Sequence, residues 1–154
     1  MVHVRQAQTG EADALGAVMW DAVHNGPSLY TAAQRAAWVP RAPSGPTWAA
    51  RLGDQQIWVA EEAGALLGFV TLGDGGYVDF AYVRGGAQRR GIFGALMTTL
   101  EGSARDQGAR RLWTHASLMA QPAFAQAGFH VIRHQDIERR GEILSRAEME
   151  KTLI

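Results

Sequence analysis

The sequence predicts a mixed α/β fold in which helices flank a mostly antiparallel central sheet. Strand-like and helical segments alternate along the chain, and three consecutive strand-like runs are joined by short turn signals. One longer segment has apolar residues at the three-and-four spacing of an amphipathic helix. The length of 154 residues and the even composition are typical of one domain, so we expect a single domain over 1–154.

The N-terminal part of the chain is predicted to be mainly helical after one short strand. Thr9 precedes the first helical pattern and is a candidate N-cap. Thr31 is followed three residues later by Gln34, which is the pattern of a capping box. We expect a strand at 2–7, helices at 9–25 and 31–38, and a short helical stretch at 47–52.

The remaining segments complete the sheet. The turn signals "AG" and "DGG" join three short runs that are predicted to form an antiparallel meander. The apolar positions from Ile92 to Ala104 have helical spacing, and Gly108 stands where a C-terminal cap is expected. We expect strands at 55–62, 65–73, 76–83 and 110–117, helices at 91–107 and 121–127, and a final strand pair at 129–135 and 142–150.

The composition excludes several classes of function. Lys plus Arg and Asp plus Glu both total 15, so the balance of charge does not favour nucleic acid or an acidic membrane surface as partner. The chain has no cysteine and therefore no disulfide and no thiolate nucleophile. The N-terminus does not read as a signal peptide, and the nearly apolar run at 63–70 is too short to span a bilayer. We expect a cytoplasmic protein, with the oligomeric state left open and a homodimer compatible with it.

The stretch "AQRRGIFGALM" is a candidate anion site. It places Arg89, Arg90 and Gly91 where a loop turns into a helix, and the unpaired N–H groups of a helix start attract anions such as a pyrophosphate. The two arginines would add charge-assisted donors. The pattern is neither a Walker loop nor the dinucleotide-binding fingerprint. Spacing alone leaves a solvated basic turn as the alternative.

Two segments in this region resemble the GNAT superfamily of N-acetyltransferases. Residues 78–101 resemble its acetyl-CoA-binding segment, in which a strand leads into a Gln/Arg-x-x-Gly-x-Gly/Ala loop, and 114–131 resemble the segment that follows. The positions that match are Gln88, Arg89, Arg90, Gly91 and Ile92 in the first segment, and Ala120, Gly128 and Phe129 in the second. Residues 30–38, 58–69 and 134–144 also resemble a YafP-like bacterial branch of the superfamily.

The resemblance implies an enzyme that transfers the acetyl group of acetyl-CoA directly to an amine. The pyrophosphate would bind the amides of residues 89–94, and the pantetheine arm would run beside the strand that ends at Val83, paired with the backbone of Ala81 and Val83. The acceptor would be a small-molecule or peptide amine. The cofactor-binding residues implied are Ala81, Tyr82, Val83, Gln88, Arg89, Arg90, Gly91, Ile92, Phe93, Gly94, Ser117 and Phe124.

Three positions depart from the family pattern. Phe93 stands at the second glycine of the loop, so its ring must turn away from the phosphates. Phe124 stands where many members have the tyrosine that protonates the departing thiolate, and Ser117 stands where many have an asparagine. A non-catalytic acyl-CoA-binding or sensing domain is therefore the alternative function.

Two residues are candidates for the general base. Asp79 lies in the strand "YVDFAYV", where simple alternation gives it one face with Tyr77, Ala81 and Val83, and apolar surroundings raise the pKa of a carboxylate. The alternative is that Asp79 caps a neighbour or faces solvent. His115, at the end of its strand, is the second candidate, and a purely structural histidine is the alternative there.

Aromatic residues mark the expected acceptor pocket. Tyr30 and Trp38 flank the capped helix, a region that forms the acceptor pocket in the superfamily, and Tyr77 is a further candidate; Trp38 is equally compatible with the core. His130 and His134 are too far apart along one strand to share a metal ion, so no metal is expected. The remaining tryptophans are expected in the core: Trp20, Trp48, Trp58 and Trp113.

Overall fold

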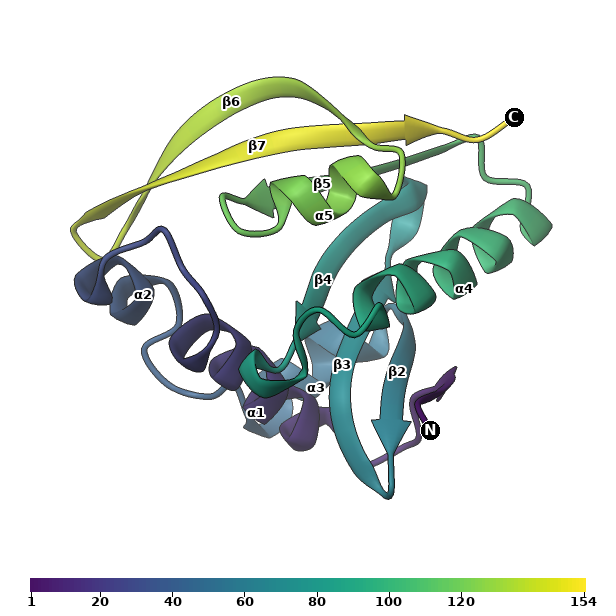
Figure 1. Ribbon diagram of the computed structural model, residues 1–154, viewed down its shortest axis with the longest axis horizontal. Helices are drawn as coiled ribbons and strands as arrows, with labels where there is room; N and C mark the ends of the chain where they lie inside the picture. Colours follow the sequence, from purple (N-terminus) through teal and green to yellow (C-terminus); the bar gives the residue numbers. More distant parts are fainter.

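A computed structural model describes all residues 1–154 (Figure 1). The strands are β1 His3–Gln6, β2 Gln56–Glu62, β3 Ala65–Leu72, β4 Tyr77–Val83, β5 Arg111–Ser117, β6 His130–Arg139 and β7 Glu142–Thr152. The helices are α1 Ala12–Asn25, α2 Ala32–Trp38, α3 Gly45–Gly53, α4 Ile92–Asp106 and α5 Gln121–Gln126, with short 3₁₀ turns η1 Asp74–Gly76 and η2 Gly85–Ala87. None of the helices is both long and apolar enough to cross a membrane.

The strands form one sheet of seven in the order β1-β2-β3-β4-β5-β7-β6. Neighbouring strands are antiparallel except for β4 and β5, which run parallel. The predicted fold class and the predicted meander of β2, β3 and β4 are therefore confirmed. The long β6–β7 hairpin extends the sheet beyond β5, toward α2 (Figure 1).

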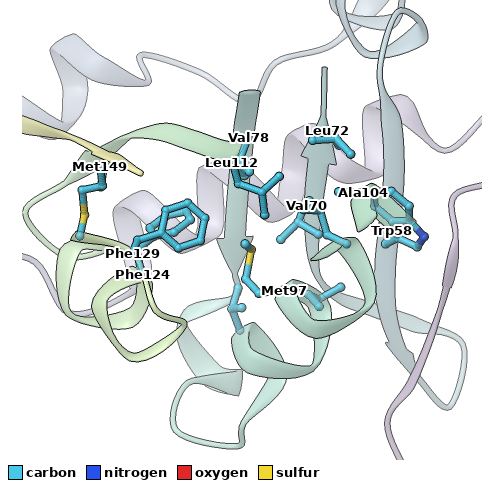
Figure 2. Close-up of a cluster of buried hydrophobic side chains, with 14 of the residues drawn as sticks. Trp58, Val70, Leu72, Val78, Met97, Ala104, Leu112, Phe124, Phe129 and Met149 are labelled. Carbon is cyan, nitrogen blue, oxygen red and sulfur yellow. The ribbon is translucent and has the colours of Figure 1, made fainter. Parts of the chain in front are cut away.

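Helices cover both faces of the sheet and bury a separate apolar layer on each. On one face, α4 and α5 enclose a core that includes Phe124, Phe129 and Met149, which lie close together in Figure 2, with Met97 contributed by α4. On the opposite face, α1 and α3 cover a second core. Burial of these side chains is the main favourable contribution to folding. The second core contains Leu15, Val18, Met19, Trp48, Phe69 and Phe80, among others.

A β-bulge in β4 decides which side chains share a face. Ala81 pairs with Val70, but the next aligned pair is Val78 with Leu72, so β4 advances three residues where β3 advances two. An extra residue of this kind reverses the alternation of side chains along the strand. Val78 and Ala81 therefore both belong to the α4 side although they are three residues apart.

This bulge corrects one prediction of the sequence analysis. Simple alternation places Asp79 on one face with Tyr77, Ala81 and Val83, and that grouping is wrong. Tyr77 and Asp79 instead line a cavity together with Tyr82, on the α1 side of the sheet. Ala81 and Val83 pack on the α4 side.

The strands β4 and β5 separate soon after they meet. Their pairing consists of Tyr77 with Trp113 and Val78 with Thr114, and it ends there. β5 remains paired with β7 along its whole length, from Arg111 to Ser117. The C-terminal half of β4 therefore has one edge free of β5, which creates an opening in the middle of the sheet.

The first helix begins later than predicted. α1 starts at Ala12, and Glu11 rather than Thr9 occupies the N-cap position. The preceding Gly10 has a φ of 91°, which is incompatible with a right-handed helix. The Glu11 carboxylate accepts hydrogen bonds from the Arg5 guanidinium and from the N–H of Gln8, so it closes the turn before the helix.

Two of the four tryptophans predicted for the core are only half-buried. Trp48 and Trp58 are buried as expected. Trp20 stacks on His24 with a centroid distance of 4.6 Å, and Trp113 packs on Tyr77 at 4.4 Å. Both of these rings remain partly exposed, so their assignment to the core is wrong.

The capping box of α2 is formed as predicted, and it joins this helix to the β6–β7 hairpin. The Thr31 hydroxyl accepts from the N–H of Gln34, and the Gln34 side chain accepts from the N–H of Thr31. The amide of the same glutamine donates to the Ile143 carbonyl. Arg140 in the hairpin turn donates to the carbonyl of Ala37 at the other end of α2. These bonds hold α2 against the hairpin.

Replacing Thr31 with alanine is expected to lower the free energy of unfolding by about 1 kcal/mol, because an N–H at the start of α2 loses its partner. Urea denaturation measures this difference. Thr98→Ala is the matched control, since Thr98 is exposed in the middle of α4 and its hydroxyl makes no hydrogen bond; its effect should stay within about 0.5 kcal/mol. Equal losses in both variants would contradict the capping role.

Candidate functional site

Three connected cavities run through the opening between β4 and β5. An outer cavity of about 1150 Å³ lies at the start of α4, a narrow cleft of about 150 Å³ lies between the separated strands, and an inner cavity of about 200 Å³ lies on the α1 side. Val83, Gln88 and Phe93 line both the outer cavity and the cleft. Trp38, Tyr82 and Ser117 line both the cleft and the inner cavity. The three cavities therefore adjoin one another across the sheet.

Most of the predicted site residues lie along this path. The outer cavity contains Val83, Gln88, Arg89, Gly91, Ile92, Phe93 and Gly94. The cleft contains Ala81, Tyr82, Val83, Gln88, Phe93 and Ser117. The inner cavity contains Tyr30, Trp38, Tyr77, Asp79, Tyr82, His115 and Ser117.

The start of α4 presents backbone donors to the outer cavity. Gly91 occupies the N-cap position in the left-handed conformation, with a φ of 75°, and no side chain caps the helix. Arg89 also has a positive φ, of 64°. The first N–H groups of a helix have no partner within the helix and carry partial positive charge. This end of α4 therefore has the properties of an anion site.

The two adjacent arginines have different roles. Arg89 lines the outer cavity. Arg90 does not; its guanidinium makes two hydrogen bonds of 2.8 and 3.0 Å to the Glu62 carboxylate at the end of β2. In this structure the charge of Arg90 is therefore paired, and its side chain joins the loop to the end of β2.

Phe93 and Phe124 form one aromatic contact behind the cleft. Their rings meet edge to face, with centroids 5.1 Å apart. Phe93 lines the cleft. Phe124 is only 2% exposed and lines none of the three cavities. In this structure the Phe124 ring belongs to the core.

The free edge of β4 faces the cleft. The N–H of Arg84 donates to the Leu67 carbonyl of the neighbouring β3. Backbone polar groups alternate between the two edges of a strand, so those of Ala81 and Val83 point to the opposite edge, toward the opening. The Gln88 side chain donates to the Val83 carbonyl at 2.8 Å. The remaining polar groups on this edge are available to an extended ligand.

A histidine and a tyrosine form a pair in the inner cavity. The Tyr77 hydroxyl lies 3.0 Å from Nδ1 of His115. Burial lowers the pKa of His115, and the nearby charge of Arg146 lowers it further, while Glu148 and Asp79 act in the opposite sense. Burial also raises the pKa of Tyr77. At neutral pH both groups are therefore uncharged.

The other candidate base is held by strong donors. The Asp79 carboxylate accepts from the Arg51 guanidinium at 2.9 and 3.2 Å and from the Gln55 amide at 2.8 Å. Arg51 also covers the ring of Phe80, with its guanidinium carbon 4.5 Å from the ring centroid. Both carboxylate oxygens are engaged by side-chain donors of the protein. Asp79 is therefore neither an isolated nor a solvent-facing carboxylate.

Two aromatic residues from the region of α2 close the inner cavity. Tyr30 is buried; its hydroxyl donates to the Ser145 carbonyl at 2.6 Å and accepts from the N–H of Leu118 at 2.9 Å. Trp38 is half-buried and packs edge to face on Tyr30, with centroids 5.6 Å apart. Tyr30 thus joins the ends of β5 and β7 as well as lining the cavity.

Sequence reasoning missed the cavity wall formed by β6 and β7. This wall contains Ile137, Arg139, Leu144 and Arg146. It lies in the site because Arg146 pairs across the sheet with Ser117, at the end of β5. Nothing in the local sequence of the hairpin signals this position, since it depends on how β7 aligns with β5.

The histidines considered as metal ligands lie elsewhere. His130 is 3.5 Å from the Glu150 carboxylate on the neighbouring strand, and His134 is exposed. No group of three or more His, Cys, Asp or Glu side chains is arranged to hold a metal ion.

Comparisons with known proteins define the class of this fold and site. A family model for the acetyltransferase (GNAT) domain matches residues 28–153. The chain belongs to the GNAT acetyltransferases. It is 30% identical over 141 residues to an N-acetyltransferase of Escherichia coli K12 named YafP, covering 91% of this chain and 89% of that protein.

Solved structures have the same fold. A GCN5-related N-acetyltransferase from Rhodopseudomonas palustris matches with a TM-score of 0.88 and 26% identity, covering 98% of this chain and 95% of that one. The acetyltransferase YncA from Salmonella typhimurium, whose structure was solved with acetyl-CoA, matches with a TM-score of 0.73 and 23% identity, covering 100% of this chain and 95% of that one.

Proposed function

We propose that this protein transfers the acetyl group of acetyl-CoA directly to the amine of an acceptor bound in the inner cavity. The observation that carries the proposal is the continuous path from the start of α4, through the cleft, to the cavity that holds His115 and Asp79. Each part of this path suits one part of the reaction.

The outer part suits the cofactor. The pyrophosphate of acetyl-CoA binds the amides at residues 89–94, with Arg89 as a further donor. The pantetheine arm lies in the cleft, and its amides pair with the free edge of β4 at Ala81 and Val83 as an added strand would. A backbone N–H of this edge then polarises the thioester carbonyl and stabilises the oxyanion. The acetyl group reaches Ser117, where the cleft opens into the inner cavity.

His115 is the general base of the proposed reaction. An alkyl amine with a pKa of about 10.4 is almost wholly protonated at neutral pH, so a proton must be removed before the nitrogen can attack. When Nδ1 of His115 donates to the Tyr77 oxygen, Nε2 keeps its lone pair and accepts that proton. Asp79 pairs with Arg51 and holds that guanidinium at the wall of the cavity.

Transfer requires one new bond and one broken bond. The amine nitrogen attacks the carbonyl carbon, the C–N bond forms, and the C–S bond of the tetrahedral intermediate breaks. The CoA thiolate is a tolerable leaving group, because a thiol has a pKa of about 8.5. The nitrogen of the tetrahedral intermediate loses a second proton, and since Phe124 has no hydroxyl, this proton passes to the thiolate through water. The first proton, held by His115, is released to solvent. No cysteine is present to carry an acetyl-enzyme intermediate.

Amine-dependent release of CoA tests this function. Purified protein with acetyl-CoA and a panel of amines should release free thiol and acetylated amine in equal amounts, and both are measurable by a thiol reagent and mass spectrometry. Binding of acetyl-CoA without turnover of any amine would instead favour an acyl-CoA sensor, the alternative that Phe93 and Phe124 raise. Failure to bind acetyl-CoA would contradict both functions.

A further inference from the structure

We propose that the acceptor carries a compact anionic group, such as a carboxylate, close to its amine, and that Arg146 binds this group while Arg139 attracts it from the outer end of the cavity. The inference rests on the proposed function, because it concerns the substrate of the same site. It identifies the acceptor as a small amino acid-like molecule rather than a simple amine.

The inner cavity carries more positive than negative charge. Its charged side chains are Arg51, Asp79, Arg139 and Arg146, and His115 is neutral at pH 7. Asp79 compensates Arg51 in a direct ion pair. The two arginines of the β6–β7 wall make no ion pair with any carboxylate of the protein.

The nearest acidic side chains do not supply the missing charge. Glu148 lies on the same face of β7 as Arg146, but it pairs with Arg133 at 3.3 Å and lies 4.0 Å from Arg111. Glu142 stands opposite Arg139 in the strand register and makes no ion pair with it. A ligand is therefore the remaining source of a counter-charge inside the cavity.

Arg146 is built into the wall in a way that leaves its terminal nitrogens free. Its Nε donates to the Oε1 atom of Gln135 at 3.0 Å, and no other side chain or carbonyl accepts from the guanidinium. The side chain is half-buried. A guanidinium in this setting suits a carboxylate or phosphonate, whose oxygens match its planar donors.

The register places this guanidinium at the right distance from the proposed base. Ser117 pairs with Arg146 and His115 pairs with Glu148, so His115 and Arg146 are diagonal neighbours. Diagonal neighbours lie about 7 to 8 Å apart, and their Cβ atoms are somewhat closer than that. An amine at Nε2 of His115 and a carboxylate at Arg146 therefore fit within one small molecule.

The rest of the wall suits a short apolar chain between the amine and the anionic group of the acceptor. Leu144 and Ile137 face each other across the hairpin, between the levels of Arg146 and Arg139. Arg139 is exposed and stands farther out, where its charge attracts an anion toward the cavity without holding it.

Matched acids and amides test the proposal. Initial rates are measured with α-, β- and γ-amino acids, with their primary amides, and with aminoalkylphosphonates of the same chain lengths. The amide removes only the negative charge, and it lowers the pKa of the amine, so chemistry alone would favour the amide. We expect kcat/KM for the best acid or phosphonate to exceed that of its amide at least about tenfold. Comparing the amino acids with the aminoalkylphosphonates shows whether the site prefers a carboxylate or a phosphonate.

Arg146→Gln should abolish this preference, measured as the ratio of kcat/KM for the acid to kcat/KM for its amide in the same variant, while leaving the affinity for acetyl-CoA unchanged. Arg41→Gln, at an exposed arginine away from the three cavities, makes the same change in net charge and should retain the preference. Arg146→Lys should retain part of it, because a lysine keeps the charge without the planar fork.

Calorimetry measures the binding of each acid and each amide to the protein saturated with CoA, and this second measurement needs no turnover. The acid should bind and its amide should not, and Arg146→Gln should lose the difference. Turnover of amides as fast as acids would overturn the inference while the proposed function stands. Turnover of no amine, together with preferential binding of acids, would overturn the enzyme and keep the anion site. Equal binding of acid and amide would overturn the inference in either case.

Discussion

Gly94→Asp is expected to weaken acetyl-CoA binding at least about tenfold while the protein stays folded. Gly94 lies in the first turn of α4 and lines the outer cavity, and a Cβ at this position would meet no atom within 4 Å. An acidic side chain near a helix N-terminus is itself stabilising, by about 0.3 to 1 kcal/mol. The new carboxylate would occupy the anion site and repel the pyrophosphate.

The size of this effect follows from Coulomb's law. Two unit charges 4 Å apart repel by about 1 kcal/mol in bulk water and by about 4 kcal/mol near a protein surface. Because the pyrophosphate carries more than one charge, the Kd for acetyl-CoA should rise at least about tenfold, which corresponds to about 1.4 kcal/mol. Isothermal titration calorimetry measures the Kd, and thermal unfolding verifies the fold.

Gly102→Asp is the matched control for this experiment. Gly102 lies farther along α4 and is exposed, and a Cβ at this position would also have no atom within 4 Å. The same substitution there should leave the Kd unchanged. If Gly94→Asp bound acetyl-CoA as tightly as the unchanged protein, the start of α4 would not be the pyrophosphate site.

Replacing His115 with glutamine is expected to lower kcat by at least about a hundredfold, within the usual contribution of a general base. The Kd for acetyl-CoA should change little, because His115 lines the inner cavity and not the outer one. His134→Gln is the matched control, since His134 is exposed on β6 and outside the three cavities. Steady-state kinetics with one amine acceptor measures kcat for each protein.

The pH dependence of kcat provides a sharper test of the same role. The base is active when neutral, so kcat should rise with pH and level off once His115 has lost its proton. Burial and Arg146 lower the pKa of His115, so the midpoint of this rise should lie below the ordinary value of about 6.5. The rise should disappear in His115→Gln. If Asp79→Asn removed the activity and His115→Gln did not, the base would be Asp79.

Local sequence patterns predicted the parts of this fold that depend on neighbouring residues. The capping box at Thr31 and Gly108 at the end of α4 are both governed by interactions within a few residues, and both are present. The order of strands and helices followed from periodicity in the same way. Thr9 was the exception, because the turn closed by Arg5 and Glu11 displaced the start of α1.

The candidate site depended more on contacts between distant residues. The loop at 88–94 was readable because its glycine and backbone donors act through local conformation. The pairing of Arg90 with Glu62 was not predicted, because Glu62 lies 28 residues earlier in the chain. The face of Asp79 was misassigned because a bulge is an offset between two strands, which periodicity in one strand does not reveal.

By itself, the sequence determined the class of fold, the glycine-rich turn into α4 and the absence of a cysteine nucleophile, since these follow from short-range periodicity, local turn chemistry and residue content. Only the tertiary structure decided which side chains meet. It separated Arg89 from Arg90, joined Tyr77 to His115, and brought Arg146 of the hairpin opposite Ser117. The physical reason is that strand register and the divergence of β4 from β5 are set by packing across the whole sheet, which no local stretch of sequence encodes.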